Sequence, residues 1–165
     1  LLFDFGAFTA GDDNRFAYRT LTTPASDWEL TVAFRALLMD SGIGFGIGIM
    51  DPTTSRVLTY LVRDTGWRMY NWSNLTSFDS IASDNVSPGG MSSRGLYWLK
   101  AKRVSGNILL QVSADGKQWF QIASIAISAY LTNSPARVGI IGNYATTTNR
   151  GYAAVEYFDL SGPAV

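Results

Sequence analysis

Few side chains in this chain could carry out covalent or acid–base chemistry. The sequence has no histidine and no cysteine, which excludes a Ser-His-Asp triad, a Cys nucleophile with His, and His-based zinc or iron sites. Glycosidases place two carboxylates about 5–9 Å apart, but the only two glutamates, Glu29 and Glu156, lie in distant stretches. Asp159 follows Glu156 by three residues, so the two point to opposite faces of a strand. We therefore predict that the protein is not an enzyme.

Side chains that could hold a sugar are more numerous. Trp and Tyr rings stack on the C–H faces of sugars, and Asn and Arg supply directional hydrogen bonds. If residues 64–66 form a three-residue turn between strands at 57–63 and 67–72, Tyr60 lies opposite Tyr70. The ligand-binding face predicted for this hairpin consists of Tyr60, Arg68, Tyr70 and Trp72. The alternative is that these rings fill the core.

Two further stretches are candidate parts of a binding site. The expected exposed loop 142–151 carries Asn143, Tyr144, Asn149 and Arg150. In the expected strand 44–50, glycines 44, 46 and 48 alternate with bulky apolar residues and leave one face bare. Such a bare face implies close approach by another group. That group is either a bulky neighbouring side chain or a ligand.

We expect no cofactor, although calcium is an open alternative. Carboxylates that could bind it lie towards the two ends of the chain, namely Asp4, Asp12, Asp13 and Asp159. Oxygen-rich loops suit Ca²⁺. Their spacing matches no known calcium loop, and adjacent acids such as Asp12 and Asp13 also suit a solvated turn.

Composition narrows the class of protein. Basic and acidic residues number 13 each, with no block of like charge, so a nucleic-acid-binding face is not expected. The sequence contains no run of 18 apolar residues, so no membrane span is predicted. The chain begins with Leu1, and we expect it to be one domain, 1–165, of a longer protein. Aromatic residues at 13%, charged residues at only 16% and 16 glycines are typical of an all-β protein rich in turns.

Alternating apolar residues predict short strands along the chain. The clearest unit is the three-strand meander at 95–127, with turns at Ser105-Gly106-Asn107 and Asp115-Gly116, where Asp-Gly is a strong hairpin signal. Residues 73–94 are predicted to be a long loop with a short strand near 77–81. The other strands are expected at 1–8, 16–21, 28–38, 137–141 and 152–160.

Several motifs occur in a familiar order. They are Trp98-Leu99-Lys100-Ala101 in one strand, Ser113 to Trp119 in a hairpin, and Val138-Gly139-Ile140 in a later strand. This order resembles the concanavalin A-like lectin/glucanase superfamily, in particular the laminin-G-like jelly rolls appended to bacterial glycosidases or carried on phage virion proteins. The resemblance implies an all-β, antiparallel two-sheet jelly-roll β-sandwich whose concave face often binds ligands. The Glu-x-Asp-x-(x)-Glu signature of the catalytic members is missing.

Three functions are compatible with these observations. The first is a non-catalytic lectin-like module that binds a glycan or cell-surface receptor at a cell or virion surface, for example on a phage fibre. The second is a purely structural virion or assembly module, with an exposed apolar patch that meets other assembly proteins. The third, a glycoside hydrolase, is the least supported. Either of the first two would suit a homo-oligomer located outside the cell or on a virion.

Overall fold

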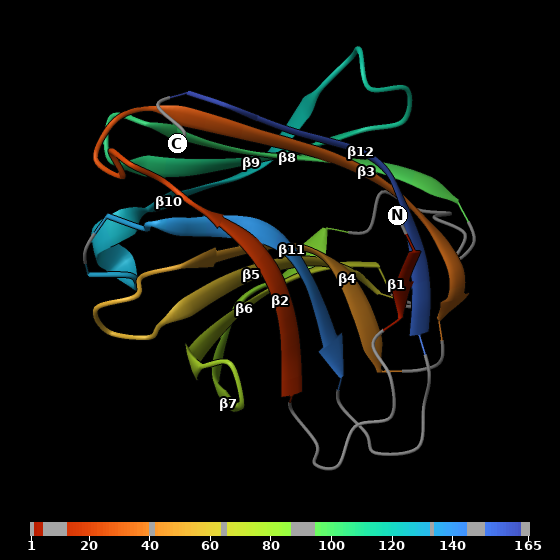
Figure 1. Ribbon diagram of the computed structural model, residues 1–165, viewed down its shortest axis with the longest axis horizontal. Helices are drawn as coiled ribbons and strands as arrows, with labels where there is room; N and C mark the ends of the chain where they lie inside the picture. The colour runs from red at the N-terminus through yellow and green to blue at the C-terminus, as the bar shows by residue number, and fades with distance from the viewer. Residues whose placement is uncertain are drawn as a thin grey trace.

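The computed structural model describes residues 2–4, 13–39, 42–63, 66–86, 95–132, 134–144 and 151–162. Two antiparallel six-stranded sheets pack face to face as a β-sandwich (Figure 1). The first sheet has the order β1-β12-β3-β8-β9-β10. Its strands are β1 (Leu2–Asp4), β3 (Trp28–Met39), β8 (Leu96–Val104), β9 (Asn107–Ser113), β10 (Phe120–Ala126) and β12 (Gly151–Ser161).

The second sheet has the order β2-β11-β4-β5-β6-β7. Its strands are β2 (Asp13–Thr20), β4 (Ile43–Met50), β5 (Val57–Arg63), β6 (Gly66–Asn74), β7 (Ser77–Val86) and β11 (Arg137–Tyr144). One short 3₁₀ turn, η1 (Ile127–Ala129), follows β10. Within the described ranges, no helix is long and apolar enough to span a membrane.

The main core lies between the sheets. Alternate side chains of β3 point inward and are almost fully buried, as their spacing predicts: Trp28, Leu30, Val32, Phe34 and Ala36. They pack against the inward face of β4 in the opposite sheet, formed by Ile43, Phe45, Ile47 and Ile49. Each large apolar side chain buried in this way stabilises the fold by about 1.5–3 kcal/mol.

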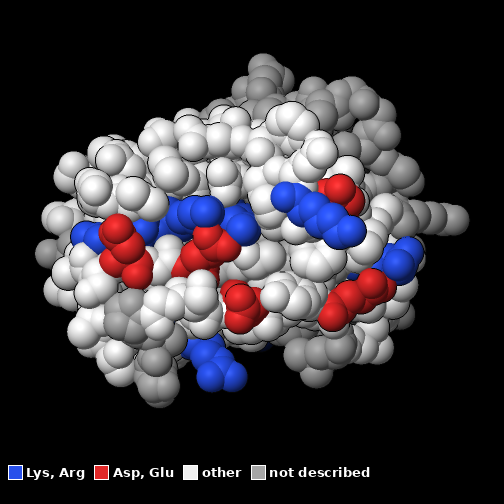
Figure 2. Space-filling view, turned by 90° about the horizontal axis from the view of Figure 1, so that it is seen from above, with Lys and Arg blue, Asp and Glu red and all other residues white. Residues whose placement is uncertain are grey.

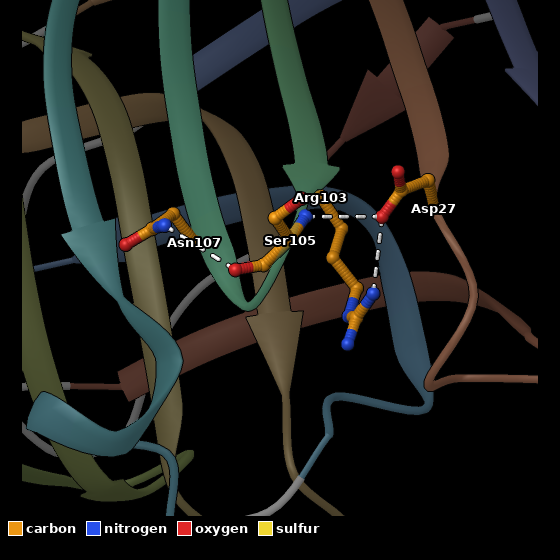
Figure 3. A network of polar contacts seen from close by, with 4 residues as sticks. All are labelled: Asp27, Arg103, Ser105 and Asn107. Carbon is orange, nitrogen blue, oxygen red and sulfur yellow. Dashed lines mark hydrogen bonds and ion pairs between the residues drawn. The ribbon is translucent and has the colours of Figure 1, made fainter.

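The predicted meander is present as β8, β9 and β10, and its first turn is tighter than expected. Ser105 and Gly106 both have positive φ, at 49° and 82°, and Asn107 already belongs to β9. The carboxylate of Asp27 fixes this turn by accepting hydrogen bonds from the Ser105 backbone N–H at 3.2 Å and from Arg103 at 3.1 Å (Figure 3). A two-residue turn of this kind matches the twist of the flanking strands.

The second connection of the meander is not the tight Asp-Gly turn that we predicted. Six residues separate β9 from β10, and only Gly116 has positive φ, at 73°. The Asp115 carboxylate accepts hydrogen bonds from the backbone N–H groups of Gln118 and Lys117, which lower its pKa. Asp115 thus organises a longer loop by capping its backbone donors.

The prediction of a long loop at 73–94 is wrong for residues 73–86, although the short strand expected near 77–81 is present, and residues 87–94 lie outside the described residues. β6 continues to Asn74, and β7 runs from Ser77 to Val86. β7 is one of the two edge strands of its sheet. Where its side chains are described, those from Phe78 to Ala82 are exposed, which explains why the stretch lacks the alternating apolar pattern of a half-buried strand.

The second sheet is strongly curled. Irregular register at four places bends the β6–β7 pair. At the tip of this hairpin, the Leu75 carbonyl accepts hydrogen bonds from the Asn14 backbone N–H at 2.9 Å and side chain at 3.0 Å. Asn14 lies on β2, at the opposite edge of the sheet, and Figure 1 shows the hairpin reaching towards it. Two distant corners of the sheet therefore meet over its outer face.

A second, smaller apolar cluster lies on this outer face, under the curl. It consists of Met50, Val57, Leu61, Tyr70, Trp72 and Ile141, with Phe16 and Leu75 packed against it. The outer face of the first sheet differs, because it carries ion pairs between neighbouring strands. Figure 2, seen from that side, shows basic and acidic groups next to one another.

Candidate ligand-binding site

The register of β5 against β6 decides which rings of the aromatic hairpin share a face. Arg63 pairs with Gly66, so only two residues connect the strands and Tyr60 lies opposite Met69 instead of Tyr70. The predicted three-residue turn is therefore wrong by one residue, and a slip of one residue moves a side chain to the other face. Tyr60 points into the main core, where it stacks on Trp67 at 5.4 Å and burial raises its pKa. It cannot contact a ligand on the outer face.

The other residues predicted on this hairpin do come together. Arg68, Tyr70 and Trp72 share the outer face of the second sheet and line one hollow of about 310 Å³. Asn143 of β11 lines the same hollow, which brings the two predicted candidate groups into one place. The residues that sequence reasoning missed are Arg63, Phe78 and Ile81.

Tyr70 stands at the polar centre of the hollow. Its hydroxyl accepts a hydrogen bond from Nη1 of Arg63 and another from Nη1 of Arg68, at 3.2 Å. The Arg63 guanidinium also lies 5.7 Å from the centre of the Tyr70 ring, within the range of a cation–π contact. Two guanidinium groups therefore converge on this hydroxyl.

Trp72 forms a wall of the hollow and not a platform for a ligand. Its side chain is 1% exposed, and its indole N–H donates to the Thr59 hydroxyl at 3.1 Å. Edge-to-face contacts join it to Tyr70 and Phe78. The apolar surface that a ligand can reach belongs instead to Phe78 and Ile81, which are 41% and 47% exposed.

Neighbouring side chains cover the bare glycine face of β4. Of the two groups expected there, a bulky neighbour or a ligand, the structure thus contains the bulky neighbour. A Cβ added at Gly44 would lie 3.0 Å from Cγ of Arg63, and one at Gly48 would lie 2.7 Å from the Phe16 ring. Gly44 thus lets the aliphatic part of Arg63 lie flat on the sheet. The glycines lie beneath these side chains and do not themselves line the hollow.

The predicted exposed loop at 142–151 is wrong at its start, because β11 continues to Tyr144, and residues 145–150 lie outside the described residues. Asn143 is buried and donates from its amide to Asn14 at 3.3 Å. Tyr144 ends β11, and its side chain lies outside the described residues, as do Asn149 and Arg150. Phe78 could have been found from the apolar residues of the predicted short strand at 77–81. Arg63 could not have been found in this way, because the predicted register, with Tyr60 opposite Tyr70, placed Arg63 opposite Trp67.

The two glutamates form ion pairs on the outer face of the first sheet. Burial raises the pKa of Glu29, but hydrogen bonds from Lys100 and Lys102 outweigh it and leave the pKa below its ordinary value. Glu156 accepts from Arg35 at 2.8 Å. Glu29 pairs with Ser161 of β12, five residues or about 16 Å along the strand from Glu156. This separation is too large for the two carboxylates of a glycosidase.

The residues considered for calcium also occupy separate places in the strand register where the structure describes them. Asp4 pairs with Tyr152 of β12, and Asp159 lies seven residues or about 23 Å further along that strand. The Asp13 carboxylate lies 3.6 Å from the Arg15 guanidinium. Asp12 lies outside the described residues, and the described part contains no cluster of three carboxylates that could hold a metal ion.

The fold is thus an antiparallel two-sheet β-sandwich, with a hollow on its curled sheet. Neither a family model nor a curated protein matches the sequence. A functionally unknown protein from Saccharomyces cerevisiae matches with a TM-score of 0.66 and 16% identity, covering 99% of this chain and 88% of that one.

Two other solved structures share the fold. The carbohydrate binding module CBM66 from Bacillus subtilis has a TM-score of 0.63 and 8% identity, over 98% of this chain and 95% of that one. A GH43 protein from Bacillus licheniformis has a TM-score of 0.61 and 17% identity, over 84% of this chain but only 28% of that one. At such identities the likeness establishes the fold.

Proposed function

We propose that this protein is a non-catalytic glycan-binding module and that the hollow on the curled sheet is its binding site. The observation that carries the proposal is the lining of the hollow. Exposed apolar groups of Phe78 and Ile81 lie beside hydrogen-bonding groups of Arg63, Arg68 and Tyr70. A sugar has the same division, with C–H faces that pack on apolar surface and hydroxyls that need directed polar partners.

The comparisons support this proposal at the level of fold. CBM66 is named as a carbohydrate binding module, and this chain covers almost all of it. The GH43 protein is much longer than this chain, so its activity is not evidence of catalysis here. The ion-paired positions of Glu29 and Glu156 argue further against a hydrolase built on these two residues.

A glycan array followed by calorimetry of the positive glycans tests the proposal. Phe78→Ala removes the exposed apolar contact and is expected to weaken binding by about 1–2 kcal/mol, or about five- to thirty-fold in Kd. Phe120→Ala is the matched control, because Phe120 is 63% exposed on β10 of the other sheet. The proposal fails if no glycan binds above background, or if both variants weaken binding equally.

A second candidate function is a structural role in a virion or other assembly. An apolar hollow of about 330 Å³ lies between the edges of the two sheets, beside β2 and β12. Tyr18, Tyr157 and Phe158 line it and are 45%, 43% and 36% exposed. Light scattering tests this role: concentration-dependent assembly that Tyr18→Ser together with Phe158→Ser abolishes would support it, whereas a monodisperse monomer would contradict it.

A further inference from the structure

Arg63 occupies an unusual position for a surface cation. Its stem lies across Gly44, and its side chain is half-buried at the end of β5. One guanidinium nitrogen, Nη1, donates to the Tyr70 hydroxyl. The Nε atom is shielded from solvent and has no hydrogen-bond partner among the described residues. The Nε–H is therefore a donor that lacks an acceptor within the described part of the chain.

No described carboxylate compensates the charge of Arg63. In contrast, the Lys100 and Lys102 ammonium groups lie 2.6 and 2.7 Å from Glu29, and Arg35 lies 2.8 Å from Glu156. A partly buried charge is costly unless an opposite charge or sufficient hydrogen bonds satisfy it. Arg68 lies opposite Asp84 in the β6–β7 ladder, so Arg63, and not Arg68, is the candidate cation for a ligand.

The Tyr70 hydroxyl adds a second donor at the same place. It accepts hydrogen bonds from the two guanidinium groups, and a tyrosine hydroxyl that accepts in this way still has its own proton to donate. The hollow thus presents a cation and a hydroxyl donor side by side. A group with two acceptor oxygens and a negative charge is their chemical complement.

Resting on the proposed function, we infer that the hollow selects acidic sugars, with a carboxylate bound by Arg63 and Tyr70. The apolar rim of Phe78 and Ile81 then contacts the sugar ring that carries the carboxylate. Uronic acids and sialic acids have this arrangement, because their carboxylate is attached directly to a ring carbon. The planar Arg fork distinguishes them from neutral sugars of the same shape.

Calorimetry with matched oligosaccharides tests the inference. The probes are a hyaluronan tetrasaccharide, an oligogalacturonide and sialyllactose, each beside its carboxyl-reduced form, together with lactose and sulfolactose. A charged hydrogen-bonded contact predicts that carboxyl reduction weakens binding of the best probe about ten- to a hundred-fold. Equal affinity for the acidic and reduced forms would overturn the inference, as would binding of the sulfated sugar alone.

Variants of Arg63 show whether this side chain is responsible. Arg63→Gln is expected to remove the preference for the acidic form while neutral forms still bind in a Phe78-dependent way. Arg63→Lys keeps the charge but not the fork, and should retain an intermediate preference. Arg19→Gln, at an exposed position on β2, is the control and should retain the full preference. A preference that survives in Arg63→Gln, with a melting temperature like that of the parent, overturns the inference.

These outcomes separate the inference from the proposed function. Binding of neutral glycans that depends on Phe78 and ignores the carboxylate refutes acidic-sugar selection and leaves the glycan-binding site in place. A lack of binding to every acidic and neutral probe refutes both.

Discussion

Replacing Gly46 by alanine is expected to destabilise the curled sheet strongly. A Cβ at this position would collide with the backbone carbonyl oxygen of Tyr60 and would lie 2.9 Å from its carbonyl carbon and 3.0 Å from Cα of Leu61. These are backbone atoms of the neighbouring strand β5, so no side-chain rotation relieves the overlap. The two strands must separate in the middle of the sheet.

The size of the effect follows from two contributions. Overpacking of this kind costs about 1–3 kcal/mol, and weakening of two ladder hydrogen bonds adds about 1 kcal/mol each. We therefore expect Gly46→Ala to lower the free energy of unfolding by about 3–5 kcal/mol. With a urea m-value of about 2 kcal/mol/M, the midpoint falls by about 1.5–2.5 M. Tryptophan fluorescence during urea titration measures this shift.

Gly44→Ala is the matched control. Its Cβ would meet side chains and not the backbone, at 3.0 Å from Cγ of Arg63 and at 3.1 and 3.2 Å from Cδ1 and Cβ of Leu61. The small repulsion is offset by the lower conformational entropy of the unfolded chain, about 0.4–1 kcal/mol in favour of alanine. The stability should therefore change by no more than about 0.5 kcal/mol. Equal losses in both variants, or an unchanged Gly46→Ala protein, would refute the reasoning.

Three other substitutions are expected to act in different ways. Trp72→Phe removes the hydrogen bond to Thr59, and chemical denaturation should show a loss of about 1–2 kcal/mol. The pKa of Glu29 is below its ordinary value of 4.5, so its ionised carboxylate stabilises the folded protein above that pH, and this contribution is lost as the pH falls. Glu29→Gln should therefore lower the melting temperature at pH 7 and not at pH 2. Asp27→Ala leaves the Ser105 N–H without its partner, so hydrogen exchange at this turn should accelerate while β7 is unaffected.

Much of the fold could be predicted because its signals are local. The alternation along β3 specifies which side chains enter the core, whatever strand lies beside it. Ser105 and Gly106 adopt positive φ in a turn that the sequence indicates. The predicted Asp115 turn failed because the same residue types also cap longer loops, and the choice depends on packing, here of Gly116 against Trp98.

The candidate site was predicted less well because it depends on register. Turns of two and three residues are both compatible with the sequence around Gly66, yet only the shorter one places Tyr60 in the core and Thr59 beside Tyr70. The length of β7 was also hidden, since this exposed edge strand lacks the pattern of a half-buried strand, although the short strand predicted at 77–81 already contained Phe78.

By itself the sequence determined the all-β class, the inward faces of the long strands and the lack of histidine and cysteine chemistry, because these depend only on residue type and spacing. The tertiary structure alone decided that the second sheet curls until Leu75 meets Asn14, 61 residues away in the chain. The same curl buries Trp72 and gathers Arg63, Tyr70 and Phe78 around one hollow. Its cause is the summed twist and bulging of six paired strands, a property of the whole sheet that no single segment encodes.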